Sequence, residues 1–377
     1  MKLLDVISVA KMEKCGNRTF PVLSMTMHDG LVLQTDRFKK TIASKDLSGY
    51  KVVRRNQLVV SFPIDEGVLY IQDVADAGIV SPAYAVWDVS TKMVIPRFLG
   101  LFLRCPKSIK HYRSKLRGST ARRRTIPRED FLAMKIPGFS IAEQDRICLV
   151  IEKIESVIKA CDKQIQSLGQ LVKSRFVEMF GDVTSNPMGW IRERLESHID
   201  VLAGYPFDSS QYVESGGINI CGGLIIMPGW IDWGQCKKWR SAREVEQYLL
   251  NDGDIVMALD RPWISTGFKV AQVRKEELPA LLIQRTARIR GVDIDQSFLL
   301  YLLKDRAFER HCTVTGSLVP HISHKDIKSY EVIVPPLTHQ REFAAFVAKV
   351  DKLAFAARQR REVAKQLYRA KIQEFFG

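Results

Sequence analysis

The sequence contains one long internal repeat, and this repeat constrains the fold more than any other feature. Residues 126–181 align without a gap with residues 322–377, at a constant offset of 196 positions. Gln144 aligns with Gln340, and both segments end in the same Glu-x-Phe-Gly pattern. Solenoid repeats are only about 20–50 residues long, so this spacing excludes a solenoid and indicates duplication of a whole folding unit.

The similarity extends upstream of the aligned segments. An apolar run at residues 98–102 precedes Gly118-Ser119, and a second run at residues 298–302 precedes Gly316-Ser317. The chain is therefore predicted to consist of two copies of one unit, each made of a globular part followed by a long helix.

Each copy ends in a segment with the apolar periodicity of a long helix. Apolar side chains recur at steps of four and three residues, which is the spacing of a coiled-coil seam. The predicted seam residues are Ile151, Ile154, Ile158, Ile165, Leu168 and Val172 in the first copy, and Val347 and Val350 in the second. Segments near 40 residues form about 60 Å of helix, more than one small domain covers. We therefore favour packing of the helices on each other over packing of each helix on its own globular part.

The globular parts have the sequence pattern of mixed α and β structure. Short β-branched runs alternate with Gly, Pro and Asp turns, and one helix is expected near residues 98–115 and another near 298–311. The sequence thus predicts an α+β fold in four parts. These are a first globular domain at 1–137, a long helix at 138–181, a second globular domain at 182–335 and a long helix at 336–377.

The chain carries a net charge of +15, and this charge is unevenly distributed. Residues 1–140 hold 24 basic against 12 acidic side chains, whereas residues 181–337 hold 18 against 20. The segment 104–128 contains ten basic residues and no acidic residue. Solvated protein faces usually mix both signs, so an acid-free run of this length favours contact with the phosphates of a nucleic acid.

Basic residues in both halves are candidates for DNA contact. In the first half they lie in the acid-free run: Lys110, Arg113, Arg117, Arg122, Arg123 and Arg124. In the second half they lie around Trp239 and in a turn-rich loop: Lys237, Lys238, Arg240, Arg243, Arg261 and Lys269. The first set is expected chiefly at phosphates. Most tryptophans are expected in core or rim packing rather than stacked on bases.

The sequence lacks the motifs of several enzyme classes. It contains no Gly-Lys dipeptide, which excludes a P-loop ATPase, and no Asn-Pro-Pro or Asp-Pro-Pro motif of amino-methyltransferases. The His321-x-x-His324 pair has no Cys, Asp or Glu cluster to complete a metal site. We therefore expect no catalysis by this chain, and no cofactor or metal bound to it.

The cysteines and the apolar segments indicate the compartment. Seven cysteines without a Cys-x-x-Cys spacing argue against a disulfide framework or a zinc ribbon and favour a reducing, cytoplasmic setting. No uncharged apolar stretch approaches the roughly 20 residues that cross a bilayer. Asp5 follows the first apolar residues directly, which argues against a signal peptide. We expect no membrane association.

Several short motifs, taken in chain order, are similar to those of one protein family. They are Gly78-Ile79-Val80-Ser81-Pro82-Ala83-Tyr84, Gly118-Ser119-Thr120, Arg175-Phe176-x-Glu178-Met179-Phe180-Gly181, Asn186-Pro187-x-Gly189-Trp190, Gly204-x-Pro206-Phe207-Asp208-Ser209 and Gly316-Ser317. In this order, and duplicated, they resemble the specificity (S) subunit of Type I restriction–modification enzymes. The resemblance covers essentially the whole chain. The first half departs from the pattern, since it starts near Val6 without a Gly-Trp opening.

The resemblance implies that each globular domain is a target-recognition domain, which reads one part of a split sequence in double-stranded DNA. It also implies that the two helices form an antiparallel coiled coil, and that a pseudo-twofold axis relates the halves. The implied partners are two methyltransferase (M) subunits, which bind S-adenosylmethionine, and restriction (R) subunits, which use ATP and Mg²⁺. The implied function is sequence-specific DNA binding that directs adenine methylation and restriction by these partners.

Two other functions fit parts of the sequence. A coiled-coil adaptor that binds only proteins would explain the helices, but the acid-free run at 104–128 argues against it. A self-sufficient nuclease or methyltransferase fragment would explain the basic charge, but the missing cofactor motifs argue against that reading.

Overall fold

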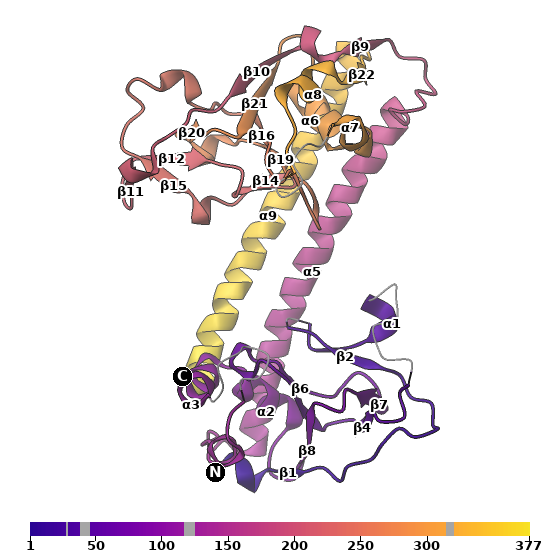
Figure 1. Ribbon diagram of the computed structural model, residues 1–377, viewed down its shortest axis with the longest axis vertical. Coiled ribbons are helices and arrows are strands. Elements are labelled where there is room, and N and C mark those ends of the chain that lie inside the picture. Colours follow the sequence, from indigo (N-terminus) through magenta and orange to yellow (C-terminus); the bar gives the residue numbers. More distant parts are fainter. Residues whose placement is uncertain (28, 38–45, 117–124, 314–319) are drawn as a thin grey trace. The chain divides into compact units, whose positions relative to one another are not determined.

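The computed structural model describes residues 1–27, 29–37, 46–116, 125–313 and 320–377, and these form two compact units. Unit 1 comprises Met1–Lys163 and Arg358–Gly377, and unit 2 comprises Gln164–Ala357. The two long helices are α5 (Ile141–Phe180) and α9 (Leu337–Phe376), and each contributes one part to each unit (Figure 1).

Each unit is built on a four-stranded antiparallel sheet, and the two sheets have the same strand order. In unit 1 the order is β1 (Ile7–Val9), β8 (Ala85–Val89), β5 (Leu58–Val60) and β6 (Leu69–Ile71). In unit 2 it is β10 (Ile199–Ala203), β21 (Thr286–Gly291), β16 (Ile255–Ala258) and β19 (Val270–Gln272). The predicted duplication is therefore present in the topology of the core sheet.

Short helices flank each sheet. In unit 1 they are α1 (Gln34–Arg37), α2 (Pro96–Leu103), α3 (Pro106–Lys115) and α4 (Arg128–Leu132). In unit 2 they are α6 (Gln296–Lys304), α7 (Arg306–His311) and α8 (His324–Ser329). Turns of 3₁₀-helix occur at Leu3–Asp5, Ile64–Glu66, Leu195–Ser197, Ser209–Gln211, Trp233–Gln235, Glu246–Tyr248 and Lys275–Glu277. The helices predicted near 98–115 and 298–311 are each present as two consecutive shorter helices.

Outside the core sheet the two units differ. Unit 1 adds two strand pairs, β2 (Leu23–Met25) with β3 (Leu31–Leu33) and β4 (Lys51–Arg54) with β7 (Ala77–Val80). Unit 2 adds a second sheet in the order β11 (Tyr212–Val213), β15 (Lys237–Trp239), β12 (Ile218–Cys221) and β20 (Ala280–Leu282). It also adds the pairs β13 (Ile226–Met227) with β14 (Trp230–Ile231), β17 (Trp263–Ile264) with β18 (Gly267–Phe268), and β9 (Arg192–Arg194) with β22 (Glu331–Ile333).

A buried glutamine near the start of each long helix joins that helix to its domain. Gln144 accepts a hydrogen bond from the backbone N–H of Ile95 (2.9 Å) and donates one to the carbonyl of Phe139 (3.0 Å). Gln340 makes the equivalent bonds to Asp295 (2.8 Å) and Pro335 (2.7 Å). The duplication thus extends to single hydrogen bonds made by side chains that are almost fully buried.

Replacing either glutamine by leucine is expected to lower the free energy of unfolding by about 1–3 kcal/mol, because a buried N–H and a buried carbonyl lose their partners. Gln144→Leu and Gln340→Leu should cost similar amounts in urea titrations of the protein. Gln170→Leu and Gln366→Leu are matched controls on exposed positions of the same helices and should cost little. Wild-type stability of Gln144→Leu would contradict the assigned role.

The ends of the long helices show how the helices run. Phe180, at the end of α5, packs on Phe298 of α6 in unit 2, with ring centroids 4.7 Å apart. Phe376, at the end of α9, packs on Phe98 of α2 in unit 1 at 5.2 Å. Since Gln144 lies in unit 1 and Gln340 in unit 2, each unit holds the start of one long helix and the end of the other. The helices are therefore antiparallel, and the predicted α+β fold with two domains and a coiled coil is confirmed.

The long helices pack both on the domains and on each other. Ile151 and Ile372 belong to the core of unit 1, while Val172 and Val347 belong to the core of unit 2. Between these ends, the buried helix side chains are Ile154, Cys161, Ala354, Ala357 and Ala364, together with Val350 in the core of unit 2. Ile158, Ile165 and Leu168 are half-buried. Packing of the helices on each other and packing of the helices on the globular domains are therefore both present. The domains cover the helix ends, and the helices cover each other between these ends.

Two ion pairs join the helices. Arg361 of α9 pairs with Asp162 of α5 (3.0 Å) in unit 1, and Arg175 of α5 pairs with Glu342 of α9 (2.9 Å) in unit 2. Arg175 interrupts the apolar series of the sequence, and the structure shows it at the helix–helix contact rather than in the core. Beyond it the fully buried side chains are Phe176 and Phe180, because the last turns of α5 face α6.

Candidate nucleic-acid interface

The basic residues of unit 1 are displayed on α3, which is fixed by a buried tyrosine. The Tyr112 hydroxyl is fully buried and donates a hydrogen bond to the carbonyl of Leu103 (2.9 Å), and burial raises the pKa of this phenol. Lys110 and Arg113 are exposed and three residues apart, so they lie on one face of the helix. Among the described residues, neither has a carboxylate within ion-pairing distance. Arg117, Arg122, Arg123 and Arg124 lie outside the described residues.

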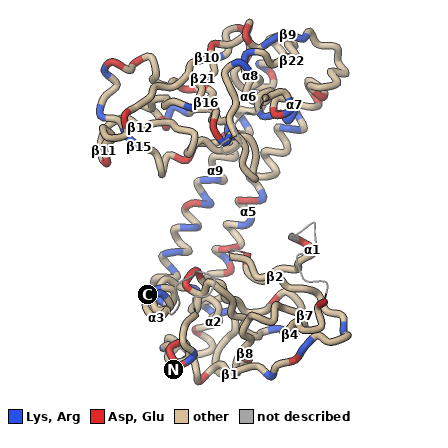
Figure 2. Tube along the Cα trace, in the orientation of Figure 1, with Lys and Arg blue, Asp and Glu red and all other residues tan. Residues whose placement is uncertain are grey.

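Charge on α3 differs in kind from charge on the long helices. Basic and acidic residues alternate along α5 and α9, whereas the residues of α3 include basic side chains and no acidic one (Figure 2). Lys115 at the end of α3 pairs with Asp130 (3.3 Å), and Lys107 donates to the carbonyl of Gly377 (3.1 Å). Lys110 and Arg113 therefore remain available for an external anion.

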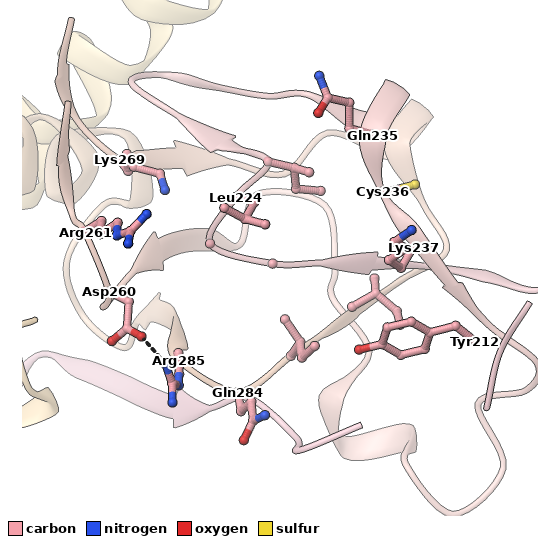
Figure 3. A pocket seen from close by; sticks show the side chains of 15 residues that line it. Tyr212, Leu224, Gln235, Cys236, Lys237, Asp260, Arg261, Lys269, Gln284 and Arg285 are labelled. Carbon is pink, nitrogen blue, oxygen red and sulfur yellow. Dashed lines mark hydrogen bonds and ion pairs between the residues drawn. The ribbon is translucent and has the colours of Figure 1, made fainter. Parts of the chain in front are cut away.

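In unit 2 a pocket of about 580 Å³ brings three of the predicted residues together (Figure 3). Lys237 comes from β15, Arg261 from the loop after β16, and Lys269 from the position between β18 and β19. Strand β12 pairs with β15 on one edge and with β20 on the other, and both β15 and the segment that follows β20 contribute to the pocket lining. The sequence predicted these residues individually, and the fold places them in one cavity.

Backbone contacts fix the positions of Arg261 and Lys269. The N–H of Arg261 donates to the carbonyl of Pro320 (2.7 Å), and the N–H of Lys269 donates to the carbonyl of Pro262 (2.8 Å). The Lys269 side chain is only 6 % exposed. Its burial, and the nearby charge of Arg261, hold the pKa of Lys269 below its usual range. Two cations therefore lie close together in this part of the pocket.

The pocket also contains residues that were not predicted from the sequence. Arg285 pairs with Asp260 (2.8 Å) next to Arg261, and the exposed residues Leu224, Gln235 and Gln284 line other parts of the pocket (Figure 3). The Leu224 side chain is 84 % exposed. In the sequence, this leucine is marked only by the turn-forming pair Gly222-Gly223 that precedes it.

The other residues of the basic-aromatic cluster lie elsewhere. Trp239 is buried and packs on Phe207, with ring centroids 4.8 Å apart, so it forms part of a small core rather than a stacking platform. Arg240 and Arg243 line a different cavity of about 560 Å³ that also contains Asp208 and Glu244. Lys238, the next residue after Lys237, lies opposite Asn219 and Val213 in the sheet and does not line the first pocket.

The described residues contain neither a candidate metal site nor a helix suited to cross a membrane. In the described ranges, no group of three or more His, Cys, Asp and Glu side chains is arranged to hold a metal ion. Burial and the charge of Lys328 lower the pKa of His324. None of the described helices combines the length and apolar character needed to span a bilayer.

The family model described as "Type I restriction modification DNA specificity domain" matches residues 198–365. The Type I restriction enzyme MjaVIII specificity subunit of Methanocaldococcus jannaschii is 24 % identical over 359 residues, which cover 88 % of this chain and 81 % of that protein. The Type I restriction enzyme EcoAI specificity subunit of Escherichia coli is 34 % identical over 172 residues, which cover 44 % of this chain and 28 % of that protein.

Solved structures have the same fold. The S subunit of a Type I restriction–modification system from M. genitalium matches with a TM-score of 0.58 at 12 % identity, over 100 % of this chain and 95 % of that chain. A chain from a structure described as the basis of complex assembly and conformational transition of the type I R-M system matches with a TM-score of 0.52 at 17 % identity, over 100 % and 96 %. Residues 198–365 therefore match a Type I restriction modification DNA specificity domain, and the chain as a whole has the sequence similarity and the fold of the specificity subunits of Type I restriction–modification enzymes.

Proposed function

We propose that this chain binds a two-part sequence in double-stranded DNA and directs adenine methylation and restriction by partner subunits, without catalysing either reaction. One observation carries the proposal: two copies of one core sheet, attached to the long helices by equivalent contacts, carry different outer structure. Two domains with a shared attachment and different outer surfaces are suited to read two different short sequences. In this proposal the recognition domains are residues 1–137 and 182–335.

The basic residues are proposed to provide the DNA contacts. Cations at phosphates supply affinity and position the protein, while side chains at base edges supply specificity. In unit 1 the exposed face of α3 and the arginines at 117 and 122–124 would contact phosphates. In unit 2 the pocket with Lys237, Arg261 and Lys269 is a concave basic surface in a domain without net positive charge, which favours local contact with an anion. Arg240, Arg243 and Lys238 would contact DNA beside it.

Loss of the cations in unit 1 is expected to weaken DNA binding equally on target and unrelated duplexes. The slope of log K against log salt should fall by up to about two for Lys110→Ala with Arg113→Ala, and by up to about three for the triple alanine variant of Arg122, Arg123 and Arg124. Fluorescence anisotropy with labelled duplexes at several salt concentrations measures this slope. Lys275→Ala, on an exposed lysine of unit 2, is the control.

The outcome of this titration also separates the proposal from a protein-binding adaptor. An adaptor would show no duplex binding at any of these salt concentrations. A slope that stays at the wild-type value in both variants would remove these residues from the DNA interface, although the chain could still bind DNA through other groups.

The partners are proposed to be two methyltransferase subunits and restriction subunits. The long helices support this, because they display apolar side chains that are exposed to solvent. These are Leu149, Val150, Val157, Leu171, Val177, Leu353, Phe355, Val363 and Leu367, each at least 37 % exposed. Exposed apolar side chains of this number on a coil are typical of protein contact surfaces. S-adenosylmethionine, ATP and Mg²⁺ would then be bound by these partners.

A further inference from the structure

One side of the pocket in unit 2 is organised to receive an anion. Figure 3 shows the nitrogen atoms of Lys269 and Arg261 directed toward each other on this side. The Lys269 side chain, 94 % buried, makes no side-chain hydrogen bond or ion pair with the described residues. The one carboxylate of the pocket lining, Asp260, pairs with Arg285 at 2.8 Å. Two neighbouring cations without a counter-charge repel each other, and an anion placed between them removes this repulsion.

Another part of the pocket lining presents an apolar side chain to solvent. Leu224 is the most exposed large hydrophobic side chain of the described residues, at 84 %. Its backbone is nonetheless held, because the N–H of Ile225 donates to the carbonyl of Gly222 (3.0 Å) and Ile225 itself is buried. The backbone of the leucine is therefore held in position, whereas its side chain extends into solvent, which is unfavourable for an apolar group.

Two amide side chains also line the pocket. Gln235 and Gln284 both line the pocket and are exposed. In the major groove, an A·T pair offers the N6 and N7 atoms of adenine, which match a glutamine amide, and the 5-methyl group of thymine, which matches an apolar side chain. No other base pair presents this combination, so the apolar and amide groups of the pocket lining suit an A·T pair.

Resting on the proposed DNA-binding function, we propose that this pocket divides its DNA contacts between its two sides. Arg261 and Lys269 together hold a single phosphate, and Leu224 reads the 5-methyl group of a thymine in the part of the target that unit 2 recognises. Lys269 and Arg261 then supply affinity on every sequence, whereas Leu224 supplies specificity at one base pair.

The apolar contact is tested with DNA that differs by one methyl group. The chain is assembled with its methyltransferase partners, its methylated target is mapped, and each thymine of the half read by unit 2 is replaced in turn by deoxyuridine. At one position this change should weaken binding by about fourfold, the value expected for loss of one buried carbon. In Leu224→Ala the same position should bind thymine and uracil equally. Val292→Ala, which removes methyl groups from a side chain 72 % exposed outside the pocket lining, should behave as wild type.

The phosphate contact is tested with Arg261→Gln, Lys269→Met and the double variant in salt titrations. Because both cations hold one phosphate, the double variant should lower the salt slope by about one unit and each single variant by no more than that, on thymine and uracil duplexes alike. A loss of about two units in the double variant, or no loss, would overturn this part of the proposal. Arg261 is exposed, so Arg261→Gln keeps the test valid if Lys269→Met does not fold.

The remaining outcomes separate this proposal from the proposed function. The thymine contact is overturned if no uracil substitution affects binding, if Leu224→Ala still prefers thymine, or if the half read by unit 2 contains no A·T pair. In each of these cases the complex still methylates a defined two-part sequence, so the proposed function stands. Absence of any defined methylated sequence would instead contradict the proposed function itself.

Discussion

Exchange of the second recognition domain for that of another specificity subunit is expected to change one half of the recognised DNA sequence and leave the other half unchanged. Unit 2 has its own core, and its attachment depends on Gln340, Phe180 and the turn that follows α5. The junctions should therefore lie at residues 181–189 and just before Leu337. Next to the first junction, Trp190 donates a hydrogen bond to the carbonyl of Phe180 (3.1 Å). Methylation mapping of the chimera with its methyltransferase partner gives the new sequence.

The reciprocal exchange, of residues 1–137, is the matched control and should change only the other half. A chimera that folds, binds its partners and methylates a site altered in both halves would contradict the assignment of one half-site to each domain.

Lengthening both long helices by one heptad is expected to widen the gap between the two halves of the target by up to about three base pairs. Seven residues add about 10 Å of helix, and the rise of DNA is about 3.4 Å per base pair. Insertions between Lys163 and Gln164 and between Ala357 and Arg358 would leave the helix ends in their domain cores. They would also keep the apolar seam in register, since a heptad preserves the pattern. The bases recognised should not change.

A heptad inserted in α5 alone serves as the control. It shifts Arg175 and Val172 relative to Glu342 and Val347, so that variant should lose stability and methylation activity. An unchanged gap in a stable double-insertion variant would mean that the helices do not set the spacing of the target.

The features predictable from the sequence were those encoded over contiguous or repeated segments. The offset of 196 revealed the duplication, and the apolar periodicity located the long helices to within three residues of their observed starts and one of their ends. Ser140 explains the start of α5, because it accepts from and donates to Glu143 in the first turn. The equivalent bonds of Gln144 and Gln340 could not be predicted in detail, although their alignment marked both positions.

The set of residues that line the basic pocket was harder to predict from the sequence. Lys237 belongs to the sheet of β12, β15 and β20, whereas Arg261 follows β16 of the core sheet, and no local pattern encodes that these two segments line one pocket. Spacing alone placed Lys237, Lys238, Arg240 and Arg243 in one cluster, whereas in the structure Lys237 lines one cavity, Arg240 and Arg243 line another, and Lys238 lines neither. Leu224 has no basic or aromatic neighbour in the sequence, and the preceding Gly222-Gly223 pair indicates only a turn, so its role is inferred from its exposure in the structure.

The central claim is that this chain directs methylation to a two-part DNA sequence, and methylation-aware sequencing of DNA tests it most directly. The DNA is taken from cells that carry this chain together with its methyltransferase partner, and from cells that carry the partner alone. We expect N6-methylated adenine at a single motif with two specific parts and a fixed gap of unspecified bases, only when the chain is present. A continuous motif without a gap, or the same methylation without the chain, would contradict the account.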